Sequence, residues 1–559
     1  MNECALLHIM DSAYCFPTSE HDITIRLRCA KGDLREVYIC YENKYVIADK
    51  QIKKPMVKTM ESKIFDYYSI SLHIEDPRIA YVFYLYDGEA YKYYSEEGLT
   101  DTYDYSIGFY NFFQYAYINK SDVISRVSWM NKARFYQIFV DRFNMGSDDK
   151  DKSYINLKWG DIPSSKSFAG GDLKGIRKKL DYIASLGVNA LYLTPIFSSV
   201  SNHKYDIIDY YRIDEQFGTS QDLKDLVKAC HEKGMKLVLD AVFNHCSNEM
   251  AQFKDVCEKG RKSPYYDWFI IKGDKPNPGR LNYEVFAHCE YMPKLNTSNP
   301  EVADFLVGVA THYINEYDID GWRLDVSDEV SHDFWRKFRI AVKSAKSDAV
   351  IIGENWHDAS SYLRGDQYDS IMNYGFTKCC LDYFARKTIH SEEMAYRLNE
   401  LLCRNNDVVN DMMLNLFDSH DTHRFFSEVK ENKDAFINAL CLLYLFPGAP
   451  CIFYGTELMM KGGYDPDCRR CMDWDKAGKI YSSELYKILT LLSDIRDKYA
   501  LRSSNVRIYD DDGLLVVRYR NEKEDITLAL NNTSKAVDGA LGTVKAGGRL
   551  IDINGRKIL

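Results

Sequence analysis

The stretch "LKGIRKKLDYIASLGVNALYLTPIF", residues 173–197, decides the fold class. Its first part spaces apolar residues along one face of a helix, and residues 188–197 form the near-continuous apolar run that is typical of a strand buried on both faces. The same pair recurs at once, because helical "TSQDLKDLVKACHEKG" at 219–234 leads into apolar "MKLVLDAVFNH" at 235–245. Strands that alternate with helices predict an α/β protein with a parallel sheet.

Eight strands of this kind can be counted outward from that stretch. They are expected at residues 134–143, 188–197, 235–245, 319–326, 349–356, 370–376, 412–421 and 449–458. Eight such repeats predict a closed (β/α)8 TIM barrel. The connection between the third and fourth strands is too long for an ordinary loop, so an inserted domain is expected after strand 3, at about 246–298.

Two regions outside the barrel have a different pattern. Near the N-terminus, runs such as 22–30, 36–42 and 80–88 alternate apolar and polar residues with turn signals between them, which predicts a β-sandwich. Similar short runs return from about Asn505 and predict a C-terminal antiparallel β-domain. We therefore expect an N-terminal β-sandwich at 1–121, a catalytic barrel at 122–500 and a C-terminal β-domain at 501–559.

Composition narrows the function classes. The chain has 559 residues, with 72 basic and 82 acidic side chains, a formal charge of −10 and no long basic run, so neither nucleic acid nor an anionic membrane is an expected partner. A neutral substrate is easier to accommodate. The 43 tyrosines suit sugar stacking, although they also suit ordinary interfaces.

The cysteines and the apolar runs indicate in which cellular compartment the protein is expected. The 15 cysteines, an odd number without a disulfide pattern, favour a reducing compartment. The N-terminal "MNECALLHIM" lacks the basic segment of a secretory signal, and the longest apolar run, "ALCLLYLF" from Ala439, is too short to cross a bilayer. We expect a cytoplasmic protein.

Acidic and basic residues collect at the ends of the predicted strands. Strand four carries Arg323 and Asp325, two residues apart and therefore on one face, the barrel interior. Strand five ends in Glu354, strand seven in His420 and Asp421, and strand three carries Asp240, Asn244 and His245. Since catalytic groups of such barrels gather at the C-terminal ends of the strands, these side chains should meet at one mouth.

Opposed carboxylates, one protonated and one ionised, carry out glycoside hydrolysis. We expect Arg323 to keep Asp325 ionised as a nucleophile. Glu354 follows apolar "VIIG", where burial can raise its pKa and make it a proton donor. A separation of about 5–5.5 Å between the two groups would give retention of the anomeric configuration.

The same motifs carry a family resemblance. "DAVFNH" (240–245), "GWRLDVSDE" (321–329), "GENW" (353–356) and "FDSHD" (417–421) resemble, in that order, the characteristic regions of the α-amylase family, glycoside hydrolase family 13. "NHKYDIIDYYRID" (202–214), "MPKLN" (292–296) and "GGYDPDCRR" (462–470) resemble its cyclomaltodextrinase, maltogenic amylase and neopullulanase branch. The resemblance runs from about Arg134 to Asp475.

Carried over residue by residue, the resemblance implies a set of site residues. Asp325 would be the nucleophile, Glu354 the acid/base, and Asp421 the carboxylate that binds and distorts the sugar. Substrate binding is assigned to His203, Tyr205, His245, Phe286, Arg323, Asn355, Trp356, His420, Asp465 and Arg469. Within that set Tyr205 would be the stacking platform, whereas Phe286 and Trp356 are equally explained as core aromatics.

The chain departs from the branch pattern on the side of the leaving sugar. Asn355 stands where a branched aliphatic residue is usual, His423 replaces an acidic residue, and Ser327 and Asp328 replace an Ala-Asn pair. These differences leave the preferred linkage, α-1,4 or α-1,6, open.

The resemblance also bears on ions and partners. No cofactor is required for the chemistry, but many relatives carry a calcium loop after "DRF"; here "NMGSDDKDKS" (144–153) places Met145 and Lys150 where ligands are expected, and lysine repels a cation. No metal ligands are therefore assigned. The N-terminal region resembles a starch-binding-type domain, which implies a homodimer.

Three readings of the function remain. The first is a retaining hydrolase of cyclodextrins, malto-oligosaccharides and pullulan-type glucans. An oligo-1,6-glucosidase or a glucan transglycosylase would use the same fold. A non-catalytic carbohydrate-binding barrel would lose acids from the mouth, whereas Asp325, Glu354 and Asp421 are all present.

Overall fold

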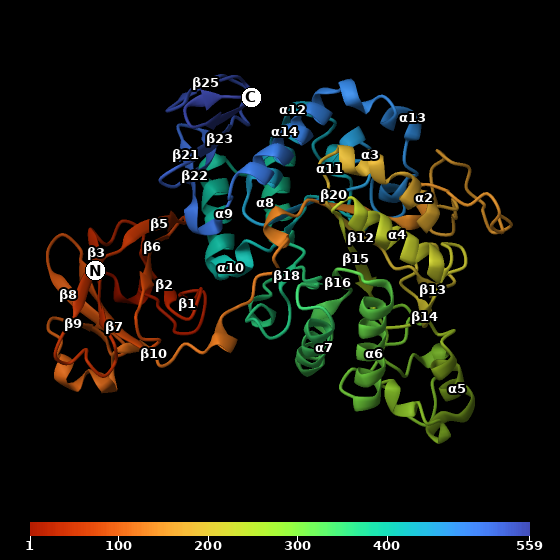
Figure 1. Cartoon of the computed structure of the whole chain (residues 1–559), viewed down its shortest axis with the longest axis horizontal. Coiled ribbons are helices and arrows are strands. Elements are labelled where there is room, and N and C mark those ends of the chain that lie inside the picture. Colours follow the sequence, from red (N-terminus) through yellow and green to blue (C-terminus); the bar gives the residue numbers. More distant parts are fainter. The chain divides into compact units, whose positions relative to one another are not determined.

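The computed structural model describes residues 1–559. The chain forms two compact units (Figure 1). The first consists of Val127–Arg386 and Met412–Ala500, and the second of Met1–Arg126, Lys387–Asp411 and Leu501–Leu559. The boundaries expected at residues 121 and 501 remain a prediction.

The first unit contains the predicted barrel. Its eight parallel strands are β11 (Phe135–Ile138), β12 (Ala190–Leu193), β15 (Lys236–Ala241), β16 (Gly321–Leu324), β17 (Val350–Gly353), β18 (Ser370–Ile371), β19 (Leu414–Asn415) and β20 (Ala449–Phe453). Their order is β18-β17-β16-β15-β12-β11-β20-β19, and a parallel bridge between Met372 and Leu414 closes the ring. Each strand lies where the sequence predicted it, so the fold class is confirmed.

Helices cover the outside of the strands (Figure 1). They are α1 (Val140–Phe143), α2 (Leu173–Lys178), α3 (Leu180–Ser185), α4 (Ser220–Glu232), α6 (Pro300–Tyr317), α7 (His332–Ala345), α8 (Tyr374–Cys380), α11 (Phe425–Glu428), α12 (Lys433–Leu445), α13 (Trp474–Ala477) and α14 (Glu484–Lys498). Helix α4 begins at a capping box, in which Thr219 and Asp222 each accept the other's backbone N–H.

Strand β16 shows how a charged side chain comes to lie in the barrel interior near the C-terminal ends of the strands. All four of its residues are buried, and Trp322 packs outward between Phe197 and Tyr313. Since side chains alternate across a strand, Arg323 is left facing the interior. Gly321 is needed where the strand begins, because a Cβ there would lie 2.3 Å from the carbonyl oxygen of Val350 on β17.

The long connection between β15 and β16 forms the expected excursion. It contains α5 (Ala251–Lys259) and short β-bridges, of which His245 to Lys294 and Val285 to Pro293 return the chain toward the strand ends. A separate hairpin, β13 (Phe197–Ser199) with β14 (Ile207–Ile213), follows β12.

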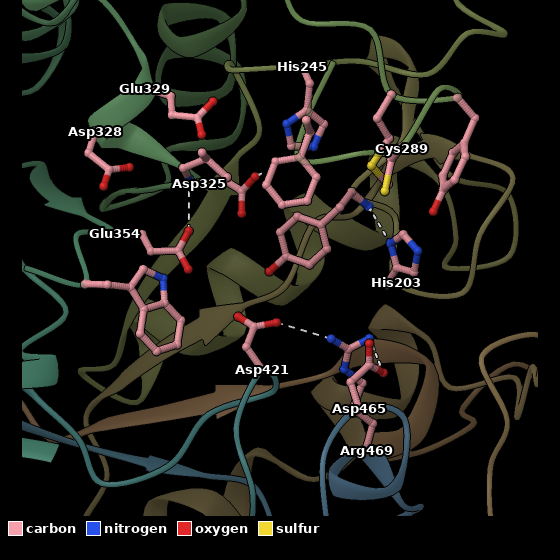
Figure 2. A pocket seen from close by; sticks show the side chains of 16 residues that line it. His203, His245, Cys289, Asp325, Asp328, Glu329, Glu354, Asp421, Asp465 and Arg469 are labelled. Carbon is pink, nitrogen blue, oxygen red and sulfur yellow. Dashed lines mark hydrogen bonds and ion pairs between the residues drawn. The ribbon is translucent and has the colours of Figure 1, made fainter. Parts of the chain in front are cut away.

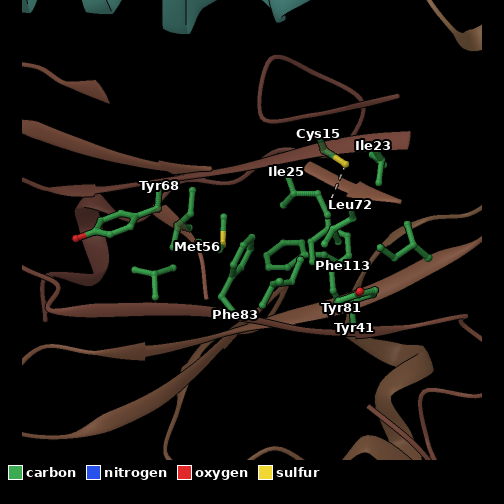
Figure 3. Close-up of a cluster of buried hydrophobic side chains, with 14 of the residues drawn as sticks. Cys15, Ile23, Ile25, Tyr41, Met56, Tyr68, Leu72, Tyr81, Phe83 and Phe113 are labelled. Atoms are coloured by element: carbon green, nitrogen blue, oxygen red, sulfur yellow. Dashed lines mark hydrogen bonds between the residues drawn. The ribbon is translucent and has the colours of Figure 1, made fainter. Parts of the chain in front are cut away.

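The second unit contains the predicted N-terminal sandwich. One sheet has the order β1-β2-β6-β5, the other β4-β3-β7-β8-β9, with β10 also pairing with β7. The strands are β1 (Cys15–Pro17), β2 (Asp22–Ala30), β3 (Glu36–Glu42), β4 (Ile52–Pro55), β5 (Val57–Glu61), β6 (Phe65–His73), β7 (Ile79–Tyr86), β8 (Tyr91–Ser95), β9 (Gly98–Thr100) and β10 (Phe113–Tyr115). Ile23 and Ile25 of β2 pack with Tyr81 and Phe83 of β7 in a common core (Figure 3).

The C-terminal part of the second unit is the expected antiparallel β-domain. Its sheet has the order β21 (Val506–Asp511), β22 (Leu514–Arg520), β23 (Asp525–Leu530), β26 (Arg549–Ile553) and β27 (Arg556–Lys557), with a separate hairpin of β24 (Val537–Gly539) and β25 (Gly542–Val544). Helices α9 (Ser391–Arg404) and α10 (Asp407–Asn410) belong to the same unit.

Candidate active site

Strand pairing fixes the backbone of two of the predicted acids. The N–H of Asp325 donates to the carbonyl of Ala241 at 3.0 Å, and the N–H of Glu354 donates to that of Leu324 at 3.0 Å. Each bond extends the parallel ladder by one residue beyond the strand. Both carboxyl groups therefore stand at the C-terminal end of the barrel on rigid strand ends.

Arg323 is the shared partner of the interior acids. Its Nη1 lies 2.9 Å from Oδ1 of Asp325 and 3.0 Å from Oδ1 of Asp240, and its Nη2 lies 2.8 Å from Oε1 of Glu354. Oε2 of Glu354 also accepts the N–H of Val326 at 2.9 Å. One fully buried guanidinium thus brings Asp325 and Glu354 side by side.

The acids open into a cavity of about 460 Å³. Figure 2 shows Asp325, Glu354 and Asp421 converging on one space from three different segments. The lining residues are His203, Tyr205, His245, Phe286, Cys289, Tyr291, Met292, Asp325, Val326, Asp328, Glu329, Glu354, Trp356, Asp421, Asp465 and Arg469. Such a cavity is large enough for a sugar chain to be held across the three carboxyl groups.

Arg469 holds Asp421 from the side away from Glu354. Its Nη2 lies 3.2 Å from Oδ1 of Asp421, its Nη1 lies 2.9 Å from Oδ1 of Asp465, and its Nε donates to the carbonyl of His420 at 2.7 Å (Figure 2). Asp465 and Arg469, both assigned to substrate binding by the resemblance, form an ion pair in the lining of the cavity.

The histidines of the site are neutral. Burial lowers the pKa of His245 to about 3, with the charge of Lys294 acting in the same direction. The amide of Asn244 donates to Nδ1 of His245 at 3.3 Å, so the ring proton is on Nε2, which is buried and has no protein partner. This N–H, 3.9 Å from Oδ2 of Asp325, is a free donor for a ligand.

His420 is oriented by a chain of hydrogen bonds. The amide of Gln137 donates to its Nδ1 at 2.7 Å, so its proton is on Nε2. That nitrogen lies 2.6 Å from the hydroxyl of Tyr205, which donates in turn to Oδ2 of Asp240 at 2.8 Å. Burial lowers the pKa of His420 well below its usual value. Tyr205 is thereby fixed in the cavity wall.

Aromatic rings form two faces of the cavity. Phe286 stacks on His245 with ring centroids 4.7 Å apart. On the side of Glu354, the indole of Trp356 stacks on Tyr374 at 3.7 Å and remains 45% exposed. Phe286 and Trp356 are thus cavity-lining residues, one of the two alternatives that the sequence left open.

The ionisation of the two central acids differs in part from the sequence expectation. Burial raises the pKa of Glu354, and the charge of Asp421 adds to the rise, in the expected direction. Burial and the charge of Glu354 also raise the pKa of Asp325 well above its usual value, although Arg323 opposes them. The expected pairing of Arg323 with Asp325 is present, but the same guanidinium serves three carboxyl groups, so the raised pKa of Asp325 opposes the ionised form that the pairing favours.

The cavity collects most of the predicted site residues but not all of them. Arg323 and His420 lie behind its lining, with exposures of 0% and 1%. Asn355 also lies outside the lining: it is buried and its Oδ1 accepts the hydroxyl of Ser327 at 3.1 Å. Its Oδ1 is therefore engaged with Ser327.

Five lining residues were not named by sequence reasoning, and a sixth, Asp328, was named only as a departure from the branch pattern on the side of the leaving sugar. Cys289, Tyr291 and Met292 come from the excursion between β15 and β16, and Val326, Asp328 and Glu329 directly follow Asp325. Asp328 and Glu329 lie on the side of Asp325, whereas Cys289 lies across the cavity (Figure 2). The excursion has no repeat period, so its sequence gave no signal for which residues face inward.

The loop at 144–153 does not fit a calcium ion. Nζ of Lys150 occupies the oxygen cluster there, 3.1 Å from Oδ2 of Asp172 and 3.1 Å from the carbonyl of Gln216. Asp149 is turned outward and 86% exposed, and Asp151 accepts the backbone and hydroxyl of Ser153. The six to eight converging oxygens that calcium needs are not gathered.

A parallel eight-stranded barrel whose strand ends bring three carboxyl groups into one cavity defines a glycoside-hydrolase type of site. Comparison with known proteins agrees: residues 137–506 match the α-amylase catalytic domain, and residues 1–119 match the α-amylase N-terminal Ig-like domain. The chain belongs to the α-amylase family of glycosidases.

Individual relatives cover nearly the whole chain. It is 44% identical over 538 residues to a cyclomaltodextrinase of Thermoanaerobacter pseudethanolicus, covering 95% of this chain and 92% of the relative. It is 39% identical to neopullulanase 2 of Thermoactinomyces vulgaris, covering 98% and 94%. A solved cyclomaltodextrinase structure superimposes with a TM-score of 0.90 at 35% identity, covering 96% and 92%.

Proposed function

We propose that this chain is a retaining α-glucoside hydrolase that acts on cyclodextrins, malto-oligosaccharides and pullulan-type α-1,4/α-1,6-glucans through a covalent glycosyl-enzyme intermediate. The observation that carries the proposal is the convergence of Asp325, Glu354 and Asp421 on one cavity. The substrate class is supported by the similarity to cyclomaltodextrinases and a neopullulanase.

In the proposed mechanism Asp325 attacks the anomeric carbon and Glu354 protonates the leaving oxygen. One proton is shared by the pair before the reaction, since burial raises the pKa of both groups. Arg323 supports the ionised form of Asp325 by its hydrogen bond to Oδ1. After departure of the leaving sugar, Glu354 removes a proton from water, which hydrolyses the intermediate.

The remaining polar groups would bind the reacting sugar. Asp421 is held by Arg469, so its carboxylate can accept sugar hydroxyls and favour the distorted ring. His245 offers its unpartnered Nε2–H as a donor. Tyr205 supplies a fixed aromatic face, and Trp356 supplies a second one on the side of Glu354.

The alternatives have specific support as well as specific tests. Asp328, Glu329 and the half-exposed Trp356 line the side where a leaving sugar or an acceptor would bind, which is compatible with an oligo-1,6-glucosidase or a transglycosylase. A product profile from cyclodextrin, starch, pullulan and panose separates these activities. Transfer products longer than the substrate would identify a transglycosylase.

The mechanism is tested by Asp325→Asn and Glu354→Gln. Each should lower kcat/KM on a malto-oligosaccharide by about 10³-fold or more, because a group that forms or breaks bonds is removed. Asp333→Asn, a 93% exposed carboxyl on α7, is the matched control and should keep full activity.

Proton NMR of the first products tests the stereochemistry. The α-anomer is expected initially, before mutarotation. Release of the β-anomer, or full activity in either acid variant, would refute the mechanism.

We also propose that the protein works as a cytoplasmic homodimer formed through its N-terminal region. The fifteen free cysteines, none of them paired, favour a reducing compartment. Exposed apolar side chains gather in one short segment of the N-terminal region, with Tyr110 86% and Phe109 55% exposed. Light scattering at micromolar concentration is expected to give twice the chain mass, and Tyr110→Ala should lower the measured mass. A monomer throughout would refute the dimer.

The helices of the chain include none with the length and apolar character needed to span a membrane.

A further inference from the structure

Lys150 lies in an oxygen-lined position that resembles a cation site. Its Nζ donates to the carbonyls of Gly170 and Gln216 and lies 3.1 Å from Oδ2 of Asp172. The side chain is 10% exposed, which is unusual for lysine. Three oxygens from two segments therefore surround one ammonium group.

The acid of this cluster is held rigidly. Asp172 caps helix α2, and its carboxylate accepts the N–H groups of Gly146, Ser147 and Gly175 at 2.7–3.0 Å. It is 1% exposed. Three backbone donors thus hold this buried carboxylate in place, and Lys150 is the cation that contacts it.

The cluster continues toward the cavity wall through Gln216. Lys150 binds the backbone oxygen of Gln216, and Lys204 binds its side-chain oxygen at 2.6 Å. Lys204 is fully buried, pairs with Asp214 at 2.9 Å, and stands between His203 and Tyr205 of the cavity. The two lysines thus join the 144–172 segment to the segment that carries the aromatic wall.

We propose that the ammonium group of Lys150 is a built-in structural cation that takes the place of a bound calcium ion, so that this region folds without metal. Removing Lys150 would leave the carboxylate of Asp172 and the two carbonyls without their cation. A carboxylate in place of the ammonium would add oxygen ligands to these three, and the position would then favour a small hard cation.

Thermal unfolding of the full-length protein tests the proposal without reference to activity. The wild-type Tm should be the same in EDTA and in millimolar calcium. Lys150→Asp, which removes the ammonium and adds a carboxylate, should lower Tm in EDTA by roughly 3–8 °C, and calcium should restore most of the loss. Lys150→Arg should have the same Tm as the wild type, and calcium should not change that Tm.

Matched variants distinguish the loss of a specific cation from a general loss of stability in this region. Lys174→Ala removes a half-exposed lysine whose ion pairs are 3.8–4.0 Å long in the same region, and it should change neither Tm nor calcium response. Lys150→Met, which keeps the side-chain length but not the charge, should lose stability without regaining it in calcium. If Lys150→Asp fails to fold in EDTA, recovery of its circular dichroism on adding calcium is the measurement.

Terbium luminescence gives a direct readout of the site. Tyr154 lies near the ammonium, with its ring centroid 5.8 Å from Nζ of Lys150, and can sensitise a lanthanide bound there. A stoichiometric signal is expected in Lys150→Asp above that of the wild type, and it should be lost in the double variant with Tyr154→Leu. Calcium dependence of the wild-type Tm, or no calcium or terbium response in Lys150→Asp, would overturn the proposal.

Discussion

Arg323 organises the active site at the scale of single residues. It contacts Asp240, Asp325 and Glu354 with one guanidinium, and the side chain is fully buried. A planar fork with several fixed donors is required for this arrangement, which a lysine could not reproduce. Burial raises the pKa of both Asp325 and Glu354, and the single guanidinium shared among three carboxyl groups does not offset that rise.

That pKa shift predicts a stability cost. The folded-state pKa of Asp325 is raised, so as pH rises from its unfolded value the unfolded chain loses the proton first and the free energy of unfolding falls. Asp325→Asn cannot titrate and should therefore be more stable than the wild type near neutral pH. The difference should shrink as the pH falls through about 4 and vanish at about pH 2, where Asp325 is protonated in both the folded and the unfolded chain.

Thermal unfolding of wild type and Asp325→Asn between pH 4 and pH 8 measures this difference. Asp333→Asn, on an exposed carboxyl, is the control and should show no such pH trend. A variant less stable than the wild type at neutral pH would contradict the prediction.

At the scale of elements, the start of β16 controls the position of two site residues. Gly321 has φ 157°, and a Cβ there would meet the carbonyl oxygen of Val350 at 2.3 Å. Gly321→Ala should therefore push β16 away from β17, cost about 1–3 kcal/mol of stability and lower activity through displacement of Arg323 and Asp325.

Gly234→Ala is the matched control for this substitution. Gly234 has φ 70° at the end of α4, and a Cβ there would meet nothing within 4 Å. It should cost about 1 kcal/mol from its backbone conformation and leave kcat unchanged. Chemical denaturation together with kcat measures both effects; equal activity losses in the two variants would argue against the strand displacement.

At the scale of the whole molecule, the cysteines give a simple prediction. All fifteen are free, and only Cys4, Cys257 and Cys289 are not buried. A thiol reagent should modify about three groups in the native protein and fifteen after unfolding, and a reducing agent should not change Tm. Since Cys289 lines the cavity, a bound malto-oligosaccharide should protect one of the three.

Mass spectrometry of the modified peptides identifies the protected thiol. Protection of Cys4 or Cys257 in place of Cys289, or a Tm lowered by a reducing agent, would contradict this account.

Much of the whole-molecule architecture could be predicted from local sequence. The eight barrel strands follow from apolar runs with helices between them, and the positions of Asp325, Glu354 and Asp421 follow from the rule that strand ends meet at one mouth. The contributions of Cys289, Tyr291 and Met292 could not be predicted, because the excursion after β15 has no period from which its inward side could be read.

The surroundings of some individual side chains also could not be predicted from the sequence. Asn355 follows Glu354 directly but turns to Ser327, which depends on how two loops pack. The pKa of Asp325 depends on the total burial of the pair, which no local pattern reports.

The first and last strands of the barrel pair with each other, so the barrel cannot close until nearly the whole catalytic unit has been synthesised on the ribosome. Tyr136, on β11, donates to the carboxylate of Glu457, which lies 321 residues further along the chain. At about 5–20 residues per second, translation separates the emergence of these two residues by about 16–64 s. Throughout that interval the nascent β11 has no partner at the edge where β20 will pair, so the ring cannot close before the last barrel strand has emerged.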